Sequence, residues 1–147
     1  MALGFVGRRK KAAFFTHFVN AQQRDQYAEN WLSEQEKEAK AAKARKAFEH
    51  TLKVGDILYS SWGYDQTNID FYEVVETKGK KTVVLRRRNV CRGPEKEFMT
   101  ADVMAGPGFM TDKTQSYRVT EGNWVRLNSY SGAGPWDGKA RRISWYA

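Results

Sequence analysis

The chain is poor in residues that form covalent cross-links or bind metals. Its 147 residues include one cysteine, two histidines and three prolines. One cysteine cannot form an intramolecular disulfide, and one cysteine with two histidines cannot supply the four ligands of a structural zinc site. Cys91 is expected to be a small apolar filler, because no histidine lies in the same part of the chain to activate its thiol.

The chain also lacks long apolar runs and an export signal. None of its apolar runs approaches the roughly 18 residues that a membrane-spanning helix needs. At the N-terminus, the apolar residues 1–7 precede the basic residues 8–11, whereas a secretory signal has its charge first. These features predict an intracellular protein without a membrane segment.

Sequence motifs of catalysis are missing as well. There is no P-loop, no dinucleotide-binding glycine motif and no nucleophile elbow. A metal-dependent nuclease needs carboxylates that converge on a cation, and the spacing of the aspartates does not require convergence. Asp56 and Asp137 have the sequence context of turn residues, and the other candidates are Asp65 and Asp70. We therefore expect a protein that is not an enzyme and uses no metal or cofactor.

Positive charge is abundant and evenly spread. The chain has 25 Lys and Arg against 17 Asp and Glu, a net charge of +8. Residues 1–50 hold 10 basic and 6 acidic side chains, and residues 51–147 hold 15 and 11, so each part carries +4. Such a balance favours nucleic acid or another acidic partner through long-range attraction, although many soluble proteins are this basic.

Composition changes near His50, which divides the chain into a basic arm with helices (1–50) and an antiparallel β-module (51–147). Residues 22–50 contain no glycine or proline, and residues 34–47 are almost all strong helix formers, which predicts a long helix. Between Leu32 and Phe48 the only apolar residues are alanines. The helix is therefore expected to be solvated and anchored at its two ends. Alternatively, its alanine face docks closely onto a partner.

An apolar patch precedes the long helix at residues 12–19. Phe14 and Phe18 are four residues apart and would share one face of a short helix, which we expect to pack on the β-module. The alternative is an exposed anchor for a groove on a protein partner. The partner-binding residues in that case would be Phe14, Phe15, Phe18, Tyr27 and Trp31.

The pattern changes to strands and tight turns after Leu52. Glycine-containing turns at 78–80 and 121–123 predict two hairpins, and the Gly-Pro segments 92–94 and 106–108 predict loops around a less regular middle. In residues 68–76, Ile69 and Phe71 alternate with Asp70 and Tyr72, which indicates two faces of a strand. The predicted fold is α+β, with N-terminal helices, one of them long, before a small SH3-like antiparallel β-barrel or curled sheet. Strands are expected at 57–62, 68–76, 81–88, 116–120, 124–130 and 141–146.

Part of the β-module resembles a known group of proteins. The segments VGDILYSSWGYDQTNIDFY (54–72), WVRLNSY (124–130) and PWDGK (135–139) carry the likeness, which covers about residues 52–147. They resemble an uncharacterised small β-module family of bacteriophages and mobile elements. The resemblance implies a phage or plasmid setting, in the cytoplasm of a bacterial host, and supplies no catalytic residues.

The loop from Trp62 to Asn68 is a candidate binding element. Gly63 permits a tight bend, and Trp62 with Tyr64 would form a stacking platform for a base or a peptide side chain. Alternatively, Trp62 closes one end of the β-module. For Asp65 and Asn68 we favour binding to the turn backbone.

The sharpest basic cluster is Arg86-Arg87-Arg88 with Arg92. On a strand, Arg86 and Arg88 share one face and Arg87 takes the other. At the opposite end of that strand lie Lys78, Lys80 and Lys81. Together these side chains would follow a phosphate backbone, or else form a solvated edge whose charges prevent edge-to-edge aggregation.

The leading hypothesis is a non-enzymatic phage or mobile-element accessory protein that binds nucleic acid or a nucleoprotein complex. Its contacts would be the arginine and lysine cluster, with Trp62 and Tyr64 stacking. The main alternative is a protein-targeted inhibitor of a host defence system, such as a CRISPR effector, acting through the N-terminal helices. A virion structural component is a further alternative.

Overall fold

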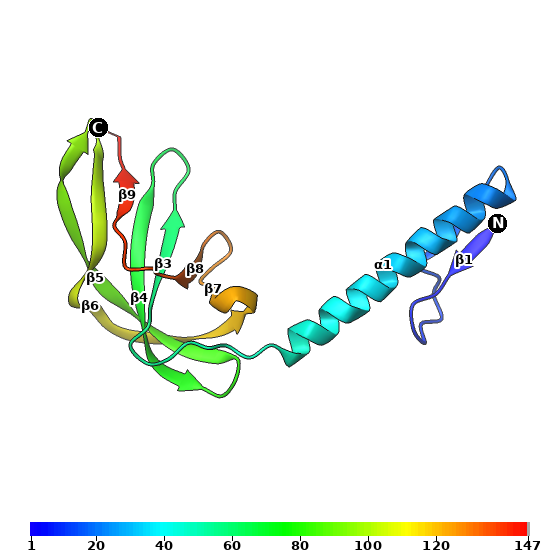
Figure 1. The fold of residues 1–147 in the computed structure, drawn as a ribbon, viewed down its shortest axis with the longest axis horizontal. Coiled ribbons are helices and arrows are strands. Elements are labelled where there is room, and N and C mark those ends of the chain that lie inside the picture. Colours follow the sequence, from blue (N-terminus) through cyan, green and yellow to red (C-terminus); the bar gives the residue numbers. More distant parts are fainter. Residues whose placement is uncertain (147) are drawn as a thin grey trace. The chain divides into compact units, whose positions relative to one another are not determined.

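The computed structural model describes residues 1–146 as parts of two compact units, Met1–Ala47 and Phe48–Ala147 (Figure 1). The boundary between them lies close to His50, where the composition changes. The first unit holds the single long helix and the second is rich in strands, so the α+β class is confirmed. Within residues 1–146, no helix combines the length and hydropathy that crossing a membrane requires.

The first unit pairs a short hairpin with the long helix. Strand β1 (Ala2–Gly4) pairs antiparallel with β2 (Phe14–Thr16), and α1 (Ala21–Ala47) follows. The side chain of Asn20 caps α1, because its Oδ1 accepts a hydrogen bond from the Gln23 backbone N–H at 2.8 Å. The expected long helix is confirmed, but it is the only α-helix in residues 1–146, so the prediction of several N-terminal helices is wrong.

The predicted short helix around Phe14 and Phe18 is a strand and a loop instead. The ring of Phe14 lies against Gly4, where an added Cβ would be 2.2 Å from the Phe14 Cε1. This close approach holds β2 on β1. The same ring packs edge-on against Tyr27 and Trp31, at centroid distances of 5.0 and 5.2 Å. Phe14 therefore packs on α1, where pairing with β1 prevails over helical spacing.

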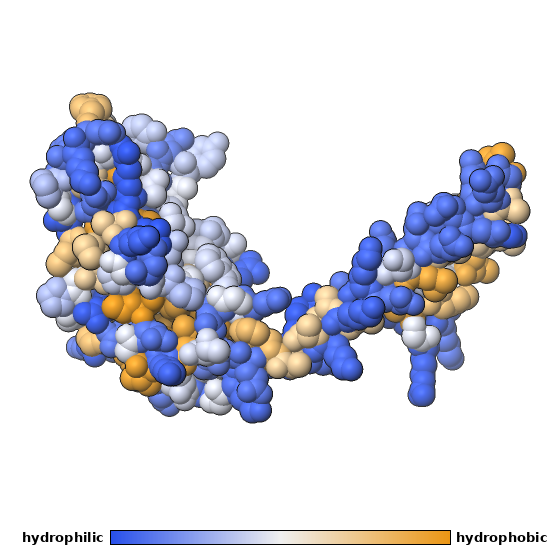
Figure 2. All heavy atoms as spheres, viewed as in Figure 1, coloured by the Kyte–Doolittle hydropathy of each residue, from blue (hydrophilic) through white to orange (hydrophobic). Residues whose placement is uncertain are grey.

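No residue of α1 is buried over its 27 residues. Figure 2 shows hydrophilic side chains over much of the helix. Its regularity therefore depends on the helix propensity of its Ala, Glu and Lys residues and on pairs such as Arg45 with Glu38. The absence of burial agrees with the expected solvated helix.

The second unit is a curled antiparallel sheet. Its strand order is β5-β4-β3-β8-β7-β6-β9, and β5 also pairs with β6 (Figure 1). A 3-10 turn, η1 (Glu121–Asn123), joins β6 to β7 as the expected second hairpin. The strands are β3 (Ile57–Trp62), β4 (Asn68–Lys78), β5 (Thr82–Glu97), β6 (Thr100–Thr120), β7 (Trp124–Arg126), β8 (Gly132–Pro135) and β9 (Arg141–Ser144).

The SH3-like barrel is not confirmed, and the sheet is not a barrel. Strands β5 and β6 are 16 and 21 residues long, far longer than the short strands expected. The Gly-Pro segments 92–94 and 106–108 lie inside these strands, so their assignment to loops is wrong. The register shifts between Arg88 and Val90 and between Arg92 and Glu95, and such bulges accommodate glycine and proline without ending a strand.

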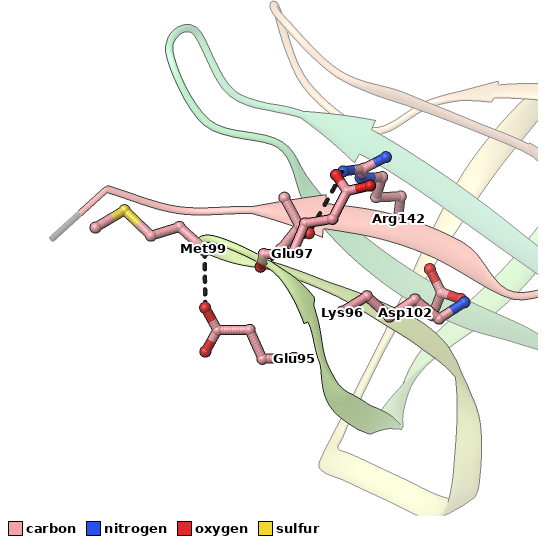
Figure 3. Close-up of polar contacts among 7 residues, drawn as sticks. Glu95, Lys96, Glu97, Met99, Asp102 and Arg142 are labelled. Atoms are coloured by element: carbon pink, nitrogen blue, oxygen red, sulfur yellow. Dashed lines mark hydrogen bonds and ion pairs between the residues drawn. The ribbon is translucent and has the colours of Figure 1, made fainter.

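The far ends of β5 and β6 meet at a tight turn held by charged side chains (Figure 3). Met99 has a positive φ of 54°, which is unusual for a residue other than glycine. Its backbone N–H donates to the Glu95 carboxylate at 2.8 Å. Ion pairs of Lys96 with Asp102 and of Arg142 with Glu97 stabilise the same turn.

Both faces of β4 are buried. Leu58 and Val74 belong to one core cluster, whereas Ile69 and Phe71 belong to a second cluster, with Trp136 beside it. The alternation read from residues 68–76 is therefore confirmed. Because Asp70 and Tyr72 take the face of the first cluster, two polar groups lie at the edge of an apolar core.

Replacing Phe71 by alanine is expected to lower the free energy of unfolding by about 3–5 kcal/mol, because it opens a cavity in the second cluster. The Phe71 side chain is fully buried, whereas Phe98 at the turn of β5 and β6 is 83% exposed. Phe98→Ala is the matched control, with a change below about 0.5 kcal/mol. Urea denaturation measures both, and similar losses for the two variants would contradict the placement of Phe71.

Candidate functional site

A buried carboxylate organises one face of the sheet. Asp70 on β4 is 9% exposed. Its Oδ2 accepts a hydrogen bond from Trp62 Nε1 at 2.8 Å, and its Oδ1 accepts one from the Arg87 guanidinium. The register explains the meeting, because Ser60 pairs with Asp70 and Tyr72 pairs with Arg87, and cross-strand partners share a face. The buried charge is therefore compensated by one cation and one neutral donor.

A cavity of about 340 Å³ lies beside this network. Its wall includes two phenol rings, two cations and several hydroxyl or amide groups, and Leu85 of the first core cluster also lines it. Its size suits a small molecule or a single nucleotide. We call it the Tyr72 cavity; its lining residues are Tyr72, Leu85, Arg87, Thr111, Lys113, Thr114, Gln115 and Tyr117.

An irregularity in the β5–β6 pairing builds one side of the Tyr72 cavity. Arg86 pairs with Thr114 and Arg88 pairs with Phe109, so residues 110–113 of β6 all face the single residue Arg87. A bulge of this kind turns side chains away from the regular alternation of a strand. It is this segment that brings Thr111 and Lys113 to the cavity.

The two phenols of the cavity stay neutral. Burial raises the pKa of Tyr72 above its usual value, and the Asp70 carboxylate adds to the rise while Arg87 opposes it. Burial also raises the pKa of Tyr117. At neutral pH both O–H groups therefore donate hydrogen bonds, and both rings offer uncharged aromatic faces.

Positive charge remains in the cavity after the internal pairs are counted. Arg87 is neutralised by Asp70. Lys113 has no ion-pair partner among residues 1–146. An anionic group that enters the cavity would therefore meet one cation that no protein carboxylate holds.

The arginines predicted to bind phosphate all have internal partners. Arg86 pairs with Asp112, and Arg88 pairs with Glu73 and donates to the Gly106 carbonyl. The guanidinium groups of Arg86 and Arg88 both approach the Phe109 ring, whereas Arg87 points to Asp70 on the other face. The expected division of faces is thus observed, but the cluster is not a row of unpaired cations.

The remaining predicted contacts are dispersed. Arg92 lies over the Trp145 ring at 3.9 Å, and Lys80 forms an ion pair with Glu49 at 2.5 Å. Lys78 and Lys81 flank the β4–β5 turn. Tyr64 is fully exposed in the loop after β3, and Gly63 makes the expected tight bend, where an added Cβ would be 2.0 Å from the Gln66 carbonyl oxygen.

The structure brings only Trp62 and Arg87 together among the predicted site residues. The prediction missed Tyr72, Lys113 and Tyr117 as site residues, and the one signal for them was the alternation that puts Tyr72 on the face of Asp70. Asp56 and Asp137 bind backbone N–H groups in turns, as expected. Residues 1–146 hold no group of three or more His, Cys, Asp or Glu side chains that could bind a metal.

The chain matches no protein-family model, no curated protein and no solved structure. The resemblance of residues 52–147 to a phage β-module therefore remains a prediction. The argument for function has to come from the chemistry of the site, which combines aromatic rings, neutral hydroxyl donors and one unpaired cation.

Replacing Asp70 by alanine is expected to lower the free energy of unfolding by about 2 kcal/mol, because Arg87 and Trp62 lose their common acceptor. The loss is moderate since the Arg87 side chain is 38% exposed and regains water. Asp65→Ala, in the loop after β3, should leave stability within about 0.5 kcal/mol. Urea denaturation of the two variants measures the difference, and an unchanged D70A protein would contradict the network.

Stability is expected to fall as the pH rises above about 10. The unfolded chain releases its tyrosine protons near that value, whereas folded Tyr72 and Tyr117 have raised pKa values and hold theirs longer. The contribution is intact below that pH and is lost as the pH passes through the folded pKa. Tyr72→Phe should make the decline shallower, and Tyr64→Phe should not. Denaturation curves from about pH 9 to 11 measure it, and identical slopes would contradict the burial of Tyr72.

Proposed function

We propose that the protein binds nucleic acid through the Tyr72 cavity and catalyses no reaction. One observation supports this most directly. The cavity combines two neutral aromatic rings with Arg87 and an unpaired Lys113 in a chain of net charge +8. The setting in a phage or mobile element remains part of the proposal and depends on the resemblance alone.

Each part of a nucleotide finds suitable chemistry in this cavity. The faces of Tyr72 and Tyr117 would stack on a base, a contact worth about 1–3 kcal/mol per base. Lys113 would approach the phosphate, which is the main source of affinity and of salt dependence. Stacking tolerates any base because each has an aromatic face, so we expect weak sequence preference.

Lys113 is a better phosphate ligand than the Arg86-Arg87-Arg88 cluster. Each of those arginines already bonds a carboxylate, so moving it to a phosphate would exchange one ion pair for another with little gain. Lys113 has no internal pair to break. The three arginines would then contribute mainly structure.

The first test is the affinity for a fluorescently labelled oligonucleotide, measured by anisotropy. Tyr117→Ala should weaken binding about tenfold, because a base loses a stacking face. Tyr64→Ala removes an equally large side chain from the exposed loop and should leave the affinity unchanged. Loss of binding in Y64A but not in Y117A would move the contact to the Trp62–Asn68 loop.

A charge reversal separates local contact from general attraction. Lys113→Glu and Lys139→Glu change the net charge equally, and neither lysine has an internal ion pair among the described residues. We expect only K113E to lower the affinity strongly and to reduce the slope of log K against log salt by about 0.7. Equal effects of the two variants would leave nothing specific to the cavity.

The surface of α1 favours a protein partner as the second candidate. The helix has no buried residue, and Leu32 and Phe15 are each more than half exposed. An inhibitor that acts through this unit would use them as its interface. Leu32→Glu would then abolish binding to the target protein, whereas nucleic-acid binding through the Tyr72 cavity would be unaffected.

A further inference from the structure

A second cavity of about 340 Å³ lies at the β7–β8 hairpin. It combines an indole, a phenol and a guanidinium with small polar side chains. No part of it was identified as a site from the sequence or used in the proposed function. We call it the Trp124 cavity; its lining residues are Thr120, Trp124, Arg126, Asn128, Ser129, Tyr130, Ser131 and Gly132.

The indole of Trp124 rests on glycine backbone. A Cβ at Gly132 would lie 2.5 Å from the Trp124 Cζ2, and one at Gly134 would lie 3.0 Å from its Cε3. Only glycine leaves room for the ring there, so the neighbouring strand β8 fixes its position. Trp124 nevertheless remains 48% exposed. The result is a large, supported aromatic surface that is open to a ligand.

The hairpin loop is held in shape before any ligand arrives. The Asn128 side chain accepts hydrogen bonds from the backbone N–H groups of Tyr130 and Ser131, at 3.0 and 2.8 Å. Arg126 donates to the carbonyls of Asn128 and Ser129 and has no carboxylate partner among residues 1–146. Its charge is therefore available to an anion, and the loop needs little ordering when it binds.

Tyr130 connects the two cavities. It lines the Trp124 cavity and is 77% exposed. Leu127, at the start of the same loop, packs on the core cluster that also supports Tyr72 and Tyr117. Tyr130 lies close enough to Tyr72 to contribute to its raised pKa. The loop thus reaches from one cavity towards the other.

We propose that the two cavities form one track for single-stranded nucleic acid, in which unpaired bases stack on Tyr72 and Tyr117 and on Trp124, with Tyr130 between them. The inference depends on the proposed function and names its ligand class. In a duplex the bases stack on one another, so aromatic side chains can reach their faces only in a single strand. Lys113 and Arg126 would hold the phosphates at the two ends.

The test uses the full chain with oligothymidylates of about 4 to 20 nucleotides and duplexes of equal length. Single strands should bind at least tenfold more tightly than duplexes. Affinity should increase with length until both cavities are filled. Trp124→Ala and Tyr130→Ala should each weaken binding about fivefold or more for the long strands and leave the shortest strand unaffected. Trp124→Phe keeps an aromatic ring and should restore much of the lost affinity.

The possible outcomes distinguish this inference from the proposed function. Equal affinity for duplex and single strand would overturn the track and leave nucleic-acid binding in place. Unchanged binding of long strands by W124A, with weakened binding by Y117A, would also overturn the track. Failure to bind any oligonucleotide would overturn both. Thermal unfolding of W124A and W124F establishes that each variant is folded, so a loss in W124A that W124F restores is a loss of stacking.

Discussion

The buried charge of Asp70 is the constraint that determines the candidate site. A carboxylate at the edge of an apolar core must be paired, and the register of β3, β4 and β5 supplies Trp62 and Arg87 for this purpose. The same pairing turns Arg87 into a wall of the Tyr72 cavity and leaves Lys113 as its unpaired cation. One internal compensation thus determines both the shape and the charge of the cavity.

The irregular pairing of β5 and β6 has an equally large effect. Over most of their length these strands are an ordinary antiparallel ribbon. Where residues 110–113 face Arg87 alone, the ribbon gains side chains that a regular ladder would have pointed elsewhere. The candidate site therefore lies where the sheet departs from its regular pattern, beside a core that remains regular.

Local signals in the sequence predicted the elements but not the site. The helix followed from a stretch without glycine or proline, and the hairpin turns followed from Gly79 and Gly122, which have positive φ in the structure. Phe14 was misassigned because its helical spacing competed with a contact to Gly4, ten residues earlier in the chain. The Tyr72 cavity depends on register shifts between distant segments, and no local pattern encodes these.

The glycines beneath Trp124 have a consequence for how variation in this chain would act. A single methyl group at Gly132 would occupy the space of the indole, so a change that touches no aromatic, charged or polar side chain would displace the ring. Sequence drift at so small a residue would silence the surface while every recognisable ligand-binding group remained in place. Related chains are therefore best compared at Gly132 before their tryptophans are counted.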